Sequence, residues 1–316
     1  MDIIAQFQDK EIAKVIDPTV AAFAPLLKKK KTFIQEIPTK SFKYGNTDRH
    51  QLDVYYPLEQ GSRKKTPILF FIYGGGFNTG ERSISPKTFG LVYACVGAFY
   101  ARRGYIVVVP DYRLVPHITY PAPAEDVRDA VRWVVAHADE CLVSPGSPSP
   151  DLEKIALMGH SAGAAHVATM VWDTNVLAED DELRKRIVAT ILESPPYDLS
   201  MMTVDWPTAP IHIHYYGGTI ELVHANAPML FYRKLSKSFA ETLPKILMVE
   251  GENEPDWLLD AGVSFHKEVK DKTGEDVKKI VAKGHNHISL NWALSTGVGE
   301  DWAEELVEWL DKLVAQ

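Results

Sequence analysis

Ser161 lies in the run KIALMGHSAGAAH (residues 154–166), between Gly159 and Gly163 and directly after an apolar segment. A Gly-X-Ser-X-Gly sequence between a strand and a helix is typical of a nucleophile elbow, in which the serine takes a strained backbone conformation. Both glycines are needed there because a Cβ atom would collide with the neighbouring strand and helix. The motif alone is moderately specific, and the strand-like run before it strengthens the prediction.

A serine hydroxyl is a weak nucleophile, so the elbow requires a base within hydrogen-bonding distance and an acid that orients the base. With this elbow, the acid and then the base follow the serine along the chain. Two acidic or histidine-containing loops do so, VEGENEPDW (249–257) and VAKGHNHISL (281–290), each after a strand-like run. The candidates for the base are His285 and His287, and those for the acid are Glu252, Glu254, Asp256 and Asp260.

The segment FFIYGGGFNTG (70–80) contains three successive glycines after an apolar run. Such a run costs backbone entropy, and its use is to expose N–H groups. Two of these groups, together with the N–H of Ala162, can stabilise a developing oxyanion, and one such donor is typically worth about 3 kcal/mol of activation free energy. The alternatives are a flexible turn or a phosphate cradle. No Lys-Ser/Thr pair or dinucleotide-type helix start follows, which disfavours the cradle.

Short apolar, β-branched runs alternate with helical patterns along most of the chain, which predicts a mostly parallel sheet covered on both faces. Ligands of such sheets bind beyond the carboxyl ends of the strands, where the three motifs above are expected. We expect an antiparallel pair at 33–45 and 50–57, then strands at 66–73, 105–113, 154–159, 187–194, 245–251 and 276–284, and helices at 87–102, 123–138, after Ser161, at 256–270 and at 299–314.

Two segments do not fit this alternation. The first 31 residues predict two short amphipathic helices around Asp17-Pro18, and residues 195–243 form an irregular insertion with a helix around 227–241. We expect one domain over 1–316, with 1–40 and about 195–243 as lid elements. Within the insertion, IHIHYY (211–216) predicts an extended segment with His212 and His214 on one face, a spacing that metal sites use, but no third ligand is nearby.

The composition is that of an ordinary globular protein, with 316 residues, 46% hydrophobic and 24% charged residues. A net charge of -8 disfavours a nucleic-acid partner, and the one lysine run, Lys28 to Lys31, is expected to be a solvated helix end. No window has the roughly 18 apolar residues of a membrane span, and no signal peptide or disulfide framework is recognisable. The sequence therefore predicts a cytoplasmic protein without stable membrane insertion, and it leaves the oligomeric state open.

The motifs described above, together with VVVPDYRLVPHITYPAPAEDVRDAVRWV (107–134) and GHNHISL (284–290), resemble the hormone-sensitive-lipase-like branch of the α/β-hydrolase carboxylesterases from about Gln51 onward. The resemblance implies an α/β-hydrolase fold and cleavage of short to medium acyl esters through an acyl-enzyme, without metal or organic cofactor. It implies catalytic roles for Ser161 as nucleophile, His287 as base, Glu254 as acid, and Gly75, Gly76 and Ala162 as oxyanion donors.

The resemblance also implies that Asp111, Tyr112 and Arg113 brace the loops of the site. Two residues depart from the family pattern. Tyr73 replaces the usual His before the glycines, and Glu254 replaces the usual Asp, so Asp256 remains a rival for the acid.

The function predicted from the sequence is that of a serine hydrolase acting on a small-molecule carboxylic ester. The alternatives with the same three catalytic groups are acyl transfer, lactone-forming cyclisation and formamide hydrolysis. A different class of function, a non-catalytic small-molecule binder on the same fold, is disfavoured by the presence of all three groups.

Overall fold

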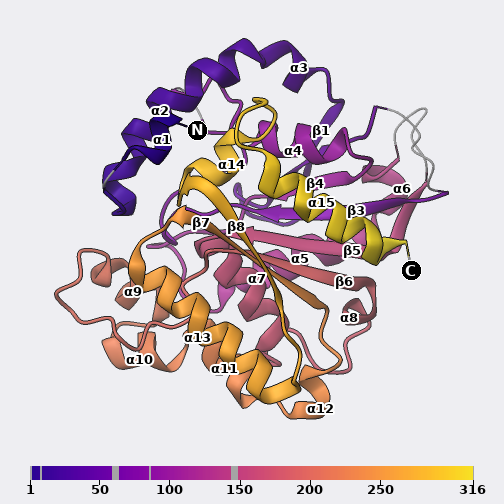
Figure 1. Cartoon of the computed structure of the whole chain (residues 1–316). Helices are drawn as coiled ribbons and strands as arrows, with labels where there is room; N and C mark the ends of the chain where they lie inside the picture. Colours follow the sequence, from indigo (N-terminus) through magenta and orange to yellow (C-terminus); the bar gives the residue numbers. More distant parts are fainter. Residues whose placement is uncertain (1, 8, 59–63, 85–86, 144–148, 316) are drawn as a thin grey trace.

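The computed structural model describes residues 2–7, 9–58, 64–84, 87–143 and 149–315. Within these residues an eight-stranded sheet runs through the molecule in the order β1-β2-β4-β3-β5-β6-β7-β8 (Figure 1). The strands are β1 (Thr39–Lys43), β2 (Gln51–Tyr55), β3 (Thr66–Ile72), β4 (Ile106–Pro110), β5 (Pro150–His160), β6 (Ile187–Glu193), β7 (Lys245–Asn253) and β8 (Lys278–Asn286). Strand β2 is antiparallel to both its neighbours, and all pairs from β4 to β8 are parallel.

Helices cover both faces of the sheet, as the continuous apolar character of β3 and β4 requires, since both strands are buried along their whole length (Figure 1). Helices α4, α14 and α15 pack on one face and α5, α7 and α11 on the other. Their bounds are α4 (Ala94–Ala101), α5 (Ala122–Ala136), α7 (Ala162–Trp172), α11 (Pro228–Lys234), α14 (Ser289–Ala293) and α15 (Asp301–Val314). The predicted α/β-hydrolase fold is therefore confirmed.

The remaining helices are α1 (Asp2–Ala5), α2 (Ile12–Lys29), α3 (Lys31–Gln35), α6 (Ala138–Cys141), α8 (Leu183–Arg186), α9 (Ala209–Tyr216), α10 (Ile220–Ala225), α12 (Lys237–Ala240) and α13 (Asp256–Thr273). Of these, α13 packs beside α7, with the rings of Trp172 and Phe265 stacked 4.8 Å apart. Among the described residues, no helix is long and apolar enough to cross a membrane.

Several element predictions were wrong in detail. The first strand, expected over 33–45, begins only at Thr39, because residues 33–35 belong to helix α3. The helix expected over 87–102 begins only at Ala94, and the one around 227–241 is divided into α11 and α12. Pro18 lies inside α2 rather than between two helices, because Val15, Thr19 and Phe23 form a buried face that continues across it.

The segment IHIHYY is part of helix α9 and is not extended. Residues two apart on a helix point about 200° apart, so His212 and His214 do not share a face. Their ring nitrogens lie 2.8 Å from the Thr208 carbonyl and 3.3 Å from the Pro116 carbonyl, respectively. In the described part of the chain, no group of three or more His, Cys, Asp or Glu side chains is arranged to hold a metal ion.

Candidate active site

Ser161 occupies a sharp turn between β5 and α7, with φ 52° and ψ -122°. Residues other than glycine rarely adopt this backbone conformation, so the surrounding structure must hold Ser161 in it. A Cβ atom on Gly159 would lie 2.6 Å from Cα of Ala164 in the helix, and one on Gly163 would lie 2.1 Å from the Ile72 carbonyl oxygen in β3. Both glycines are thus required by close approach of the helix and the neighbouring strand, as the motif predicts.

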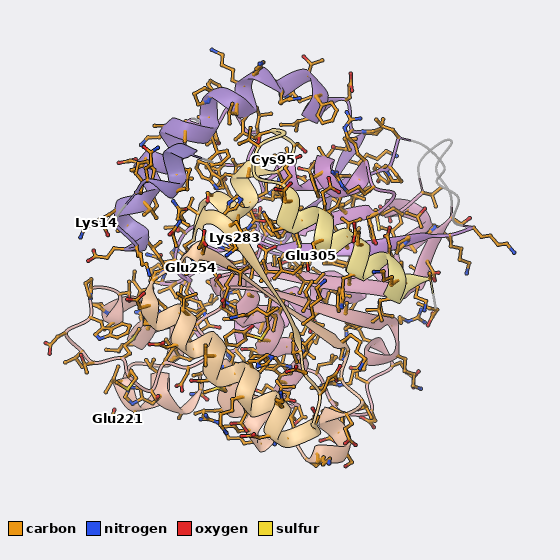
Figure 2. The ribbon with its side chains drawn as sticks, in the orientation of Figure 1. Lys14, Cys95, Glu221, Glu254, Lys283 and Glu305 are labelled. Atoms are coloured by element: carbon orange, nitrogen blue, oxygen red, sulfur yellow. The ribbon has the colours of Figure 1, made fainter. Side chains whose placement is uncertain are left out.

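Two hydrogen bonds connect the predicted nucleophile, base and acid. His287 Nε2 lies 2.9 Å from Ser161 Oγ, and His287 Nδ1 lies 2.7 Å from Glu254 Oε2. Glu254 is fully buried and His287 is 2% exposed. Glu254 follows β7 and His287 follows β8, so three parallel strands deliver the three side chains to one edge of the sheet. Figure 2 shows Glu254 at this edge, between the N-terminal helices above and α9 and α13 below.

The other candidates for the acid, Glu252, Asp256 and Asp260, do not contact His287. The Asp256 side chain is 81% exposed and pairs with Lys10 over 2.7 Å. Glu252 bonds Lys283 and the Gly284 N–H, and Asp260 is exposed. Glu254 is thus the acid that the structure brings to the histidine.

The other histidines nearby do not reach Ser161 Oγ. His285 lies with Nδ1 3.0 Å from Ser289 Oγ and Nε2 2.8 Å from the Gly299 carbonyl, and burial lowers its pKa to about 4. His160 donates from Nε2 to the His287 carbonyl over 2.8 Å, and burial lowers its pKa well below 6.5. Burial lowers the pKa of His166 to about 3. All three rings are neutral at pH 7, so none places a positive charge beside His287.

Sequence reasoning missed Ser194, whose hydroxyl binds the second carboxylate oxygen of Glu254. Its Oγ–H donates to Glu254 Oε1 over 2.6 Å, and the Gly251 N–H lies 3.3 Å from the same oxygen. Ser194 follows β6 with a φ of 45°, which turns its side chain toward Glu254. A serine directly after a buried strand was the available signal, but only the fold shows that β6 and β7 are neighbours.

The glycine loop after β3 lies directly against the elbow. A Cβ atom on Gly74 would lie 2.9 Å from Cβ of Ser161. Gly75 and Gly76 have φ values of 149° and 57°, and within the described residues neither of their N–H groups has an acceptor. Ala162 is the first residue of α7, where an N–H has no partner inside the helix. The three predicted oxyanion donors therefore flank the nucleophile.

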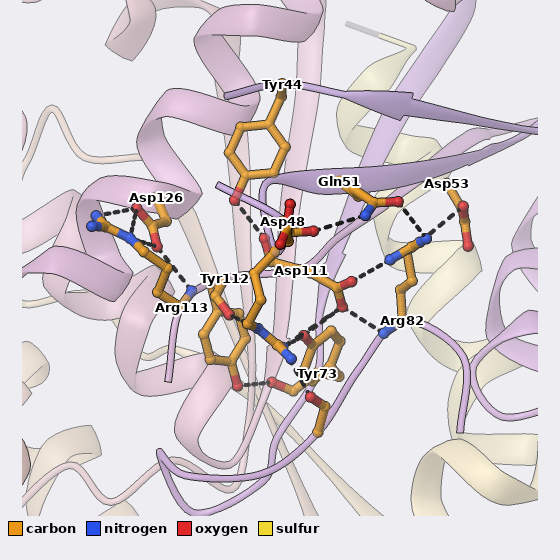
Figure 3. Close-up of polar contacts among 12 residues, drawn as sticks. Tyr44, Asp48, Gln51, Asp53, Tyr73, Arg82, Asp111, Tyr112, Arg113 and Asp126 are labelled. Atoms are coloured by element: carbon orange, nitrogen blue, oxygen red, sulfur yellow. Dashed lines mark hydrogen bonds and ion pairs between the residues drawn. The ribbon is translucent and has the colours of Figure 1, made fainter. Parts of the chain in front are cut away.

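Tyr73, the residue that departs from the family pattern, belongs to a buried polar network (Figure 3). Its Oη donates to Asp111 Oδ1 and accepts from Arg49 Nη2, each over 2.7 Å. The Tyr112 hydroxyl donates to the Tyr73 carbonyl over 2.8 Å. The Arg82 N–H donates to Asp111 Oδ1 over 2.7 Å, and its guanidinium pairs with the same carboxylate. Burial and the nearby Asp111 charge raise the pKa of Tyr73 well above 10, so it remains a donor.

Removing this donor is expected to destabilise the protein. Tyr73→Phe leaves the buried Asp111 carboxylate with one hydrogen bond fewer, which should lower the free energy of unfolding by about 1–3 kcal/mol. Urea titration followed by circular dichroism measures the change. The control is Tyr197→Phe, because the buried Tyr197 hydroxyl has no partner among the described residues. Equal effects of the two variants would contradict the role of the Tyr73 hydroxyl.

The chain is similar to known proteins over much of its length. The family model BD-FAE matches residues 52–227, which is more than half of the chain. The chain belongs to the BD-FAE family. It is 28% identical over 223 residues to Esterase LipI of Mycobacterium tuberculosis, an alignment that covers 67% of this chain and 62% of LipI. The chain thus spans less than two thirds of the length of that relative.

Two further similarities are to a curated protein and to a solved structure. Kynurenine formamidase of Drosophila melanogaster is 24% identical over 81% of this chain and 76% of its own. The crystal structure of inhibited Esterase B from Lactobacillus rhamnosis superposes with a TM-score of 0.68 at 18% identity, covering 95% of this chain and 97% of that one. With the family match and the esterase relatives, these findings confirm the predicted resemblance to the α/β-hydrolase carboxylesterases.

Proposed function

We propose that this protein is a serine hydrolase that cleaves small carboxylic esters with short to medium acyl chains through an acyl-enzyme. The observation that carries the proposal is the chain of hydrogen bonds from Ser161 Oγ through both ring nitrogens of His287 to Glu254. Relatives named as esterases support the same reaction class.

In the proposed reaction, Ser161 Oγ attacks the ester carbonyl while His287 Nε2 accepts its proton. Glu254 accepts the Nδ1–H bond, which fixes the tautomer and stabilises the imidazolium as it forms. The N–H groups of Gly75, Gly76 and Ala162 stabilise the oxyanion of the tetrahedral intermediate. His287 then returns the proton to the departing alkoxide. Water, activated by the same histidine, releases the acid and restores Ser161.

We further propose that 1–40 and 195–243 form a lid and supply the acyl pocket. Phe77, next to the oxyanion loop, stacks on Tyr215 of α9 with ring centroids 4.3 Å apart. This pair belongs to an apolar cluster that includes Ala162 and draws most of its residues from the insertion. On the other side, Thr19 of α2 accepts a 3.0 Å hydrogen bond from Asn286, the neighbour of His287. Both segments therefore contact the residues that surround Ser161.

The proposal is tested with a fluorophosphonate probe and a short-chain aryl ester. We expect the probe to add one phosphonyl group, located at Ser161 by peptide mass spectrometry, and to abolish ester hydrolysis in proportion to labelling. Hydrolysis in ¹⁸O-water should place label in the acid product, whereas acyl transfer or lactone formation would not. Failure of the probe to label a folded protein would instead favour a non-catalytic binder.

Formamide hydrolysis is a second candidate, favoured by the similarity to a kynurenine formamidase across most of both chains. The same attack and proton transfers apply, with an amine as leaving group. The two functions are separated by comparing kcat/KM for an aryl formamide with kcat/KM for the matched aryl ester. A higher value for the formamide would reassign the reaction while leaving the roles of Ser161 and His287 unchanged.

Ser194 is expected to contribute to the rate through Glu254. Ser194→Ala removes a hydrogen bond to a buried charged acceptor, worth about 1.5–3 kcal/mol, so kcat should fall by about tenfold or more. Steady-state kinetics on the aryl ester measures the change. The control is Ser295→Ala, since Ser295 is also buried, has a φ of 63° and donates to the Cys95 carbonyl instead. A similar loss in both variants would indicate a general effect on stability.

A further inference from the structure

A buried polar pair lies outside the proposed triad. Glu193 is the last residue of β6 and is fully buried, and Asn291 lies in α14 and is 1% exposed. Asn291 Nδ2 donates to Glu193 Oε2 over 2.8 Å. The two remaining oxygens, Glu193 Oε1 and Asn291 Oδ1, are buried and have no hydrogen-bond partner within the described residues. Two acceptors on two joined side chains thus have no donor.

This pair connects the two halves of the proposed site. The Glu193 carbonyl oxygen accepts the N–H of Ser161 over 2.8 Å, which fixes the backbone of the nucleophile. Asn291 follows His287 by four residues, on the short helix that begins after the base. A bond between these side chains therefore joins the strand beside the nucleophile to the segment that carries the base.

A proton on Glu193 would provide the donor that these two oxygens lack. An ionised carboxylate and an amide oxygen only accept hydrogen bonds, and leaving buried acceptors unpaired costs about 1–3 kcal/mol each. We propose that Glu193 carries a proton on Oε1 and donates it to Asn291 Oδ1, so that a neutral acid–amide pair positions Ser161 relative to His287. Its positioning role rests on the proposed function, whereas the protonation itself does not.

The groups that face Glu193 favour the neutral form. Burial, with the negative charge of Glu254 as a smaller contribution, raises its pKa to about 8, although the Asn291 bond acts in the opposite direction. On β5, His160 pairs in register with Glu193 and is neutral. The Glu193 charge acts on Tyr93 and Tyr100 on the α4 side. The Tyr100 hydroxyl is buried without a partner within the described residues and does not reach Glu193 Oε1.

The Arg103 guanidinium, on the α4 side of Glu193, already forms an ion pair with another residue. Arg103, which follows α4, pairs with Glu304 of α15. Within the described residues, no lysine or arginine forms an ion pair with Glu193. Its protonation is therefore the available way to neutralise the buried carboxyl group.

The sign of the pH effect follows from this raised pKa. Because the folded protein holds the proton from the ordinary pKa of 4.5 up to about 8, the stabilisation is complete below the lower value and is lost as the pH rises to the upper one. Glu193→Gln supplies the same donor at every pH, and its amide can form the equivalent cyclic pair with Asn291. The variant should therefore lack this part of the pH dependence.

The experiment measures Tm and the rate of Ser161 labelling by a fluorophosphonate for wild type, Glu193→Gln and Asn291→Leu between about pH 5 and pH 9. We expect the Tm of wild type to fall relative to that of Glu193→Gln as the pH rises. The labelling rates of these two proteins should agree within about twofold at the lowest pH, and wild type should become severalfold slower at the highest. Asn291→Leu should lower both quantities throughout.

Each outcome decides one part of the inference. Parallel Tm profiles of wild type and Glu193→Gln would overturn the protonation of Glu193. Diverging Tm profiles with a labelling ratio that does not change with pH would overturn the positioning role. If no variant, including wild type, is labelled while the Tm profiles diverge, the proposed function fails and the protonation of Glu193 stands.

Discussion

Ser161→Ala is expected to lower kcat for a short-chain aryl ester by about four to six orders of magnitude, with little change in KM. The variant removes the only nucleophile that lies within hydrogen-bonding distance of His287 Nε2 in the described structure. The oxyanion donors remain, so a small rate above that of the uncatalysed reaction should persist. Stopped enzyme assays over long incubations, with product quantified by chromatography, measure such low rates.

The control for this variant is Ser264→Ala, an exposed serine on helix α13, outside both proposed lid segments. It should keep the wild-type rate and remain labelled by the fluorophosphonate, whereas Ser161→Ala should not be labelled. Comparable hydrolysis by Ser161→Ala and wild type would refute the assignment of the nucleophile.

Glu254→Gln is expected to lower kcat by about 10⁴-fold, whereas Asp256→Asn should remain within about twofold of wild type. The amide of glutamine has no negative charge to stabilise the imidazolium, and its NH₂ group can select the wrong tautomer of His287. Asp256 contacts Lys10 at the surface and does not reach the histidine. Steady-state kinetics on the same aryl ester measures both variants.

The two acid variants form a matched pair, because each replaces a carboxylate by its isosteric amide within one loop. Similar folding of both, judged by Tm, excludes a loss of structure as the cause. A large loss in Asp256→Asn with a small one in Glu254→Gln would show that the loop rearranges when substrate binds.

The parts of the site that the sequence could predict lie within short motifs. The elbow around Ser161 depends on glycines that allow close approach of the neighbouring strand and helix, and Gly75 and Gly76 have the positive φ values that glycine permits. The choice between Glu254 and Asp256 could not be made in this way. Both lie in one loop, and the start of α13 at Asp256 turns that side chain to solvent.

The contacts that sequence patterns could not show join distant segments. Thr19 and Asn286 are separated by most of the chain, and Ser194 meets Glu254 only because β6 and β7 are adjacent. The error over α9 has a different cause. Its alternating Ile and His residues suggest a strand, but Pro210 near its start and Gly217 at its end, with a φ of 111°, delimit a helix whose Tyr215 packs on Phe77.

Asp111 receives hydrogen bonds from both ends of the glycine loop, the Tyr73 hydroxyl at the entry and the Arg82 N–H at the exit. Residues 77–79 therefore lie between two positions of the loop that are both hydrogen-bonded to the same buried carboxylate. Within this stretch Phe77 is itself buried against Tyr215, and the Thr79 N–H donates to the Gly75 carbonyl. Substitutions between the two anchors are therefore expected to change the proposed acyl pocket and the oxyanion loop together, while the ends of the loop stay fixed.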